Sequence, residues 1–160
     1  MADDPDGALY QLAFEEARRA VAQQVGALEA LRGRAGMLLA VASLATSFLG
    51  GLALQDDRPK DLLAWVGVGS FVGLVALTLV MLLPHKWVFS LTARRIIGDY
   101  IEAEQPADLA KTHRELALHL DKHFERNQRR LNRLYAAFVA TGVLLTVEVL
   151  TWLVIIWRSK

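Results

Sequence analysis

One acidic residue, Glu148, stands in a long apolar stretch, Leu134–Trp157, that contains no other charged side chain. If this stretch crosses a bilayer, its carboxyl group is costly to bury unless it is protonated, paired or hydrated. Counting from the expected outer ends of three such stretches places Glu148 at about the depth of Thr46, Ser47 and Ser70. These four residues form a candidate polar cluster. The cluster could line a proton or ion path, or it could join protomers. Alternatively, Glu148 could be protonated and hydrogen-bonded to a hydroxyl, which would lock the helices together.

No other group of residues suggests catalysis. Glu115, His119 and His123 are spaced by four, which places them on one helix face in a geometry that zinc accepts. The sequence offers no partner helix for a metal and no HExxH motif, so we interpret these histidines as solvated or interfacial. There is no cysteine, phosphate-binding loop, dinucleotide fingerprint or nucleophile elbow. We therefore expect no enzyme, no cofactor and no metal site.

Small residues recur at helical spacing in two of the apolar stretches. The first carries two such series, Ser43, Ser47, Gly51 and Ala42, Thr46, Gly50, and the second carries a GxxxG pair, Gly69 and Gly73, with Gly67 nearby. Small side chains let membrane helices approach closely. They predict helix packing within a hairpin or a homo-oligomer interface, and the two can coexist.

Three apolar stretches are long enough to cross a bilayer core of roughly 30 Å as helices. The fold class we predict is an all-α membrane protein with three transmembrane helices and long amphipathic cytoplasmic helical extensions. The expected interfacial anchors are Trp65, Trp87, Tyr135, Trp152 and Trp157. The predicted organisation is a disordered acidic lead at 1–7, an amphipathic helix at 8–34 continuous with the first span, spans at 35–54, 62–83 and 134–157, an outer loop at 55–61, a cytoplasmic helical segment at 84–133 and a tail at 158–160.

Lysine and arginine counts predict the orientation. Residues 1–34 carry four and residues 84–133 carry ten, whereas the loop at 55–61 and the tail carry two each. Cytoplasmic flanks are enriched in these residues, so we expect a cytoplasmic N-terminus and an outer C-terminus in the inner membrane. Arg126, Arg129, Arg130 and Arg133 fit this cationic belt and are candidate contacts for anionic lipid or another anion. The net charge of +1 indicates no general attraction to nucleic acid.

The layout resembles the Pycsar transmembrane effector family and, more loosely, the SLATT effector domains. The residues that carry the resemblance are Arg34-Ala35-Gly36-Met37-Leu38-Leu39-Ala40, Ile97-Gly98-Asp99-Tyr100 and Leu116–Tyr135. The resemblance implies antiphage signalling, in which a cyclic nucleotide causes the effector to disrupt the membrane. Arg34 departs from the acidic-basic pair expected there, and no nucleotide-binding residue carries over.

Two functions follow from these patterns. The first is a homo-oligomeric effector that perturbs or permeabilises the membrane in response to a cytoplasmic signal. The second is a structural or accessory subunit that docks a partner protein through its cytoplasmic helices, with no transport or catalysis of its own. An ion-conducting assembly is a third. In each case the lipid bilayer is the first partner.

Overall fold

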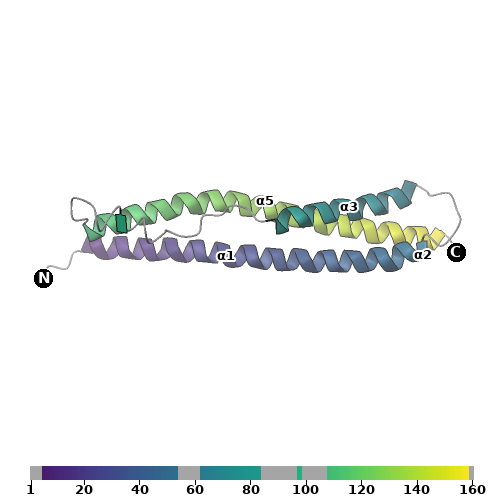
Figure 1. Cartoon of the computed structure of the whole chain (residues 1–160), viewed down its shortest axis with the longest axis horizontal. Coiled ribbons are helices and arrows are strands. Elements are labelled where there is room, and N and C mark those ends of the chain that lie inside the picture. Colours follow the sequence, from purple (N-terminus) through teal and green to yellow (C-terminus); the bar gives the residue numbers. More distant parts are fainter. Residues whose placement is uncertain (1–4, 54–61, 84–96, 99–107, 159–160) are drawn as a thin grey trace. The chain divides into compact units, whose positions relative to one another are not determined.

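The computed structural model describes residues 5–53, 62–83, 97–98 and 108–158, and every element within these ranges is helical (Figure 1). The elements are α1 (Pro5–Ala45), a π-helical turn η1 (Thr46–Gly50), α2 (Gly51–Ala53), α3 (Leu62–Leu82) and α5 (Leu109–Arg158). The all-α prediction is confirmed for these residues. Three helical stretches, Asp6–Ala53, Leu62–Leu82 and Leu109–Arg158, are long and apolar enough to cross a membrane.

Helix α1 begins at Pro5, whose fixed φ and missing N–H suit the first helical position, and it contains no further proline. It passes through Gly33 and Gly36, although glycine is a poor helix former, as an unbroken α-helix. The departure from α-helical geometry comes later, at the π turn Thr46–Gly50. The predicted amphipathic extension and most of the first predicted span therefore belong to one helix.

Helix α5 has a capped start. The Asp108 side chain accepts a hydrogen bond from the Ala110 backbone N–H at 3.2 Å, and the Asp108 carbonyl accepts one from the Thr112 hydroxyl at 2.9 Å. Aspartate at this position satisfies donors that a helix N-terminus leaves unpaired. Most of the first part of the predicted cytoplasmic segment, residues 84–96 and 99–107, lies outside the described residues, and this includes Trp87. So do the predicted loop at 55–61 and the acidic lead up to residue 4.

The chain divides into two compact units. The first, which we call the extension unit, comprises Met1–Leu28 and Lys86–Leu131. Within it the start of α1 packs on the start of α5, and the buried apolar side chains are Val21, Leu28, Leu116, Leu120 and Leu131. A buried amide joins the two helices, because Gln24 Nε2 donates to the Phe124 carbonyl at 3.1 Å and to Gln128 Oε1 at 2.9 Å.

The second unit, which we call the span unit, comprises Glu29–His85 and Asn132–Lys160. Here the end of α1, α3 and the end of α5 pack together, with small or polar residues prominent among those buried inside: Ala35, Ala42, Ala64, Ser70, Thr78, Thr141, Glu148 and Thr151. Many large apolar side chains point outward, such as Met37 at 71% exposed and Phe48 at 70%. This inversion is what lipid favours, because small residues allow close packing and large apolar ones face hydrocarbon at no cost.

One arginine caps α3 in the span unit. Arg32 donates from Nε to the Met81 carbonyl at 3.4 Å and from Nη2 to the Leu83 carbonyl at 3.3 Å. The last carbonyls of a helix lack partners within the helix and carry partial negative charge, so a cation there is stabilising. Arg32 thus ties α1 to the end of α3.

We expect Arg32→Met to lower the free energy of unfolding by about 1 kcal/mol, because it leaves these carbonyls without their charged donor. The measurement is denaturant unfolding in mild detergent. Arg34→Met removes the same charge two residues away from an exposed side chain and serves as the control. Equal losses in the two variants would show that charge, and not the cap, sets the effect.

Candidate functional site

Glu148 lies in the interior of the span unit, where its side chain is fully buried on α5. The hydroxyl of Thr46, on the π turn that follows α1, donates a hydrogen bond to Glu148 Oε1. Two of the four residues of the predicted polar cluster are therefore in direct contact. Because no other charged residue occurs in the three predicted spans, this hydrogen bond joins the single acidic side chain in the spans to a neighbouring helical element.

The π turn Thr46–Gly50 explains how α1 reaches this residue. Thr46 contacts Glu148, and Gly50 approaches Trp152, with 3.5 Å between a Cβ built on Gly50 and Trp152 Cζ2. The two contacts lie four residues apart on each element, so η1 and α5 run parallel here. A π turn accommodates one extra residue relative to an α-helical turn and is often found at functional sites.

Trp152 is the largest fully buried side chain in the described residues and links three elements. Its ring lies against Gly50 of η1 and against Gly67 of α3, where a built Cβ would be only 2.9 Å from Cζ2. The ring therefore occupies space that any side chain at residue 67 would need. The expectation that Trp152 is an interfacial anchor is wrong, because the indole is 1% exposed and packs among helices.

The contacts of α3 with α5 set the depth of Ser70. Gly67 approaches Trp152, and a Cβ at Gly73 would lie 3.3 Å from Leu144 Cδ1, so the two helices are antiparallel. Ser70 is midway between the two glycines, and Glu148 is midway between Leu144 and Trp152. Ser70 is thus level with Glu148, and it is buried.

Ser47 does not join these residues, because its side chain is exposed. Consecutive residues of a helix point in different directions, since 3.6 residues make one turn. Counting depth along the sequence placed Thr46 and Ser47 together, but depth carries no information on direction. The structure brings together Glu148 and Thr46 with Ser70 at their level.

Buried polar atoms around the site are only partly satisfied. The Trp152 indole is beside the Glu148 carboxyl group, yet neither Trp152 Nε1 nor Glu148 Oε2 makes a well-formed hydrogen bond within the described residues. An unpaired polar group in an apolar interior is destabilising. Within the described residues, the Glu148 carboxyl group therefore has one hydrogen bond, from the Thr46 hydroxyl. Glu148 Oε2 and Trp152 Nε1 could each form a further one.

A second polar level, which the sequence patterns did not indicate, lies about two helical turns before Glu148 along α5. Thr78 and Thr141 are both fully buried, and the register of α3 with α5 places them at about the same depth. The Thr141 hydroxyl donates to the Ala137 carbonyl at 2.9 Å, whereas Thr78 Oγ1 has no partner among the described residues. The signal was the spacing of seven between Thr141 and Glu148, typical of a helix seam.

Some of the small residues predicted for helix packing face the interior of the span unit, and others face away from it. Gly50 and Gly73 contact side chains of α5, whereas a Cβ at Gly51 or Gly69 would meet nothing within 4 Å. Ser43 donates to the Leu39 carbonyl of its own helix at 2.9 Å. Gly67, rather than Gly69, is thus the second α3 glycine on the packed face.

The polar groups outside the spans form no metal site in the part of the chain that is described. No group of three or more His, Asp or Glu side chains there could hold a metal ion. The rings of His119 and His123 pack edge to face with centroids 4.5 Å apart. The predicted lipid or anion contacts are exposed along α5, which leaves them accessible: Arg126, Arg129, Arg130 and Arg133.

Comparison with known proteins returns nothing for this chain. No protein-family model, no curated protein and no solved structure matches it.

We expect Gly67→Ala to destabilise the span unit by about 1–3 kcal/mol, the usual cost of overpacking a close contact, because the new Cβ would press on the Trp152 ring. Gly69→Ala is the matched control and should be close to neutral, since residue 69 faces open space. Unfolding of both variants in detergent measures the difference. Equal stability of the two proteins would contradict the position of the Trp152 ring.

The hydrogen bond between Thr46 and Glu148 can be measured by a double-mutant cycle with Thr46→Val and Glu148→Gln. We expect a coupling energy of about 0.6–2 kcal/mol, the range for hydrogen bonds between membrane helices. Ser47→Val, combined with the same Glu148 change, should show no coupling because Ser47 is exposed. A coupling at Ser47 as large as that at Thr46 would refute the assignment.

Proposed function

We propose that the protein is an effector of the inner membrane that opens its span unit on a cytoplasmic signal and makes the bilayer permeable. The burial of Glu148, with one oxygen bonded to Thr46 and the other unpaired, supports this proposal most directly. A carboxyl group in hydrocarbon is unfavourable and becomes favourable once water or a second polar surface reaches it. The closed bundle thus contains an element whose free energy falls on opening.

The two units share helices that can carry the signal. Helices α1 and α5 each contribute residues to both units without a break. In the extension unit these helices are joined by polar contacts of Gln24, and buried polar groups of this kind specify a register between helices. A ligand or protein that changes this pairing acts on helices that reach the site around Glu148.

Permeation requires more than one copy in this proposal. A single span unit has no channel, because Trp152, Leu74 and Met81 occupy its interior. The outward-facing glycines Gly51 and Gly69 have open space beside them, which suits the close approach of a helix from a second copy. A homo-oligomer would then place several Glu148 side chains around one axis after the bundles open.

The signal in this proposal is an anion, such as a nucleotide, that binds the exposed arginines of α5. With the N-terminus in the cytoplasm and the C-terminus outside, these arginines would lie on the cytoplasmic side. The resemblance to bacterial nucleotide-signalling effectors favours this signal. Nucleic acid is not a proposed partner, and no enzymatic step is needed.

An accessory subunit is the alternative, and one observation favours it. The extension unit exposes large apolar side chains that a folded protein normally buries or covers with a partner: Leu9 at 63%, Leu12 at 54%, Leu109 at 69% and Leu118 at 56%. A cytoplasmic protein docking there would make this chain its membrane anchor. Such a role predicts a heterologous crosslink and no effect on the membrane potential.

The test is induced expression in a bacterial host with a fluorescent reporter of membrane potential, with and without co-expressed nucleotide cyclases. We expect depolarisation by the wild-type protein and its loss in Glu148→Leu, because an apolar residue removes the gain on opening. Glu125→Gln, an exposed change on α5, should behave as the wild type. Carbonate-resistant membrane association of each variant must be shown first.

Depolarisation that persists in Glu148→Leu would contradict the role of the carboxyl group. An unchanged potential for the wild-type protein under every condition, together with a foreign partner crosslinked to the extension unit, would favour the accessory subunit.

A further inference from the structure

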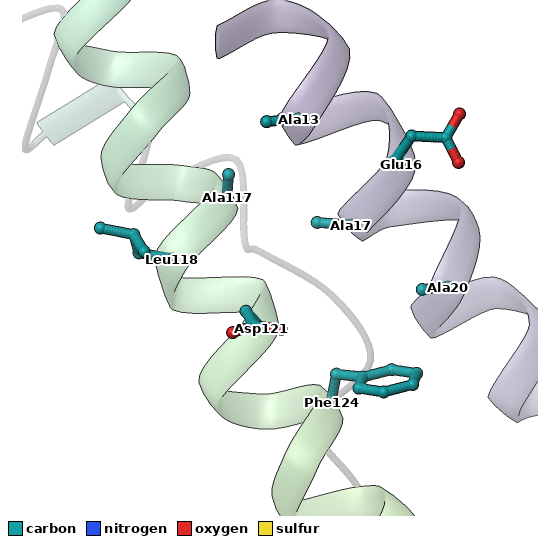
Figure 2. Close-up of a pocket in the computed structure, with 8 residues that line it drawn as sticks. All are labelled: Ala13, Glu16, Ala17, Ala20, Ala117, Leu118, Asp121 and Phe124. Atoms are coloured by element: carbon teal, nitrogen blue, oxygen red, sulfur yellow. The ribbon is translucent and has the colours of Figure 1, made fainter.

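The extension unit contains a half-open cavity of about 400 Å³ between α1 and α5. Alanines line it from both sides, and Figure 2 shows Ala13, Ala17 and Ala20 directed from α1 toward α5, which contributes Ala117 and Phe124. A volume of this size lies within the range of small-molecule sites, which are mostly apolar with few polar groups.

Two contacts along the cavity, one beside Ala13 and one beyond Ala20, hold its helices apart. On one side Phe14 stacks on His113, with ring centroids 5.7 Å apart and planes 8° from parallel. On the other side Gln24 donates to the Phe124 carbonyl and to Gln128. Helices lined only by alanine could approach one another, but these bulkier contacts set their separation. The space beside these contacts is therefore preformed.

The cavity carries one uncompensated charge. Asp121 lines it from α5, its side chain is exposed, and no ion pair or hydrogen bond to it is found within the described residues. Glu16 also borders the cavity, but its carboxylate points away from α5 in Figure 2 and pairs with Arg19 at 2.5 Å. The walls are thus apolar, and the available charge is negative.

We propose that this cavity binds a small organic cation, with its apolar body between the alanines and its ammonium group beside Asp121. The aromatic ring of Phe124, which lines the same cavity, adds apolar area and a face that attracts cations. The site is distinct in chemistry from the exposed arginines of α5, which suit anions. It does not depend on the proposed membrane function.

The test uses three matched probes, 4-phenylbutylamine, 4-phenylbutanol and 4-phenylbutyrate, which differ only in the charge of the polar end. Full-length protein in lipid nanodiscs, labelled at alanine methyl groups, is titrated with each probe by NMR. We expect the methyl signals of Ala17 and Ala117 to shift most with the amine. Affinity should fall about two- to fivefold for the alcohol, the size of one exposed ion pair, and further for the carboxylate.

Asp121→Asn should remove the preference of the amine over the alcohol, whereas Glu125→Gln, a nearby acid that does not line the cavity, should preserve it. Ala17→Leu should fill the cavity and weaken all three probes. Equal binding of amine and alcohol to the wild-type protein, a preference for the carboxylate, or no shift at Ala17 and Ala117 would each overturn the proposal. Because the readout is binding alone, a failure of the membrane function would leave this result unaffected.

Discussion

The enclosure of a carboxyl group among three apolar helical segments constrains the span unit more than any other contact. Glu148 is fully buried, and an ionisable group in such surroundings demands hydrogen-bond partners. The Thr46 hydroxyl supplies one hydrogen bond. Thr46 is the first residue of the π turn Thr46–Gly50, which directly follows α1. One turn further along α5, Trp152 fills the space left by Gly50 and Gly67. The helix register, the π turn and the positions of the glycines are all consistent with the burial of Glu148 and Trp152.

The two units meet the requirement for specific pairing by different means. The span unit uses close packing on small residues, which is the packing typical of helices in lipid, where burial of apolar surface gives no driving force between helices. The extension unit combines buried leucines with the amide of Gln24, whose two hydrogen bonds fix which residues of α5 it faces. Alanines on both facing helices leave a cavity beside these leucines. The polar contacts thus give register in the extension unit and leave room for a ligand.

Much of the architecture was predictable from hydrophobicity alone. Long uncharged stretches, the absence of proline between the extensions and the spans, and the spacing of leucines all predict the continuous helices α1 and α5. That Glu148, Thr46 and Ser70 lie at the same level along the helices was also predictable, because each helical residue advances a fixed distance along the axis. The direction of a side chain around the helix cannot be predicted in this way. For that reason the sequence pattern groups Ser47 with Thr46, favours Gly69 over Gly67 and places Trp152 at the interface.

The sequence by itself determined the helical class, the length of the apolar stretches and the presence of one acid among them, because these depend on composition and one-dimensional spacing. Only the tertiary structure decided which faces meet. The π turn alters the helix phase near Thr46, and the antiparallel register of α3 with α5 is set by how Trp152 fits Gly67. Such fits depend on the shapes of side chains from distant parts of the chain, which no local pattern records.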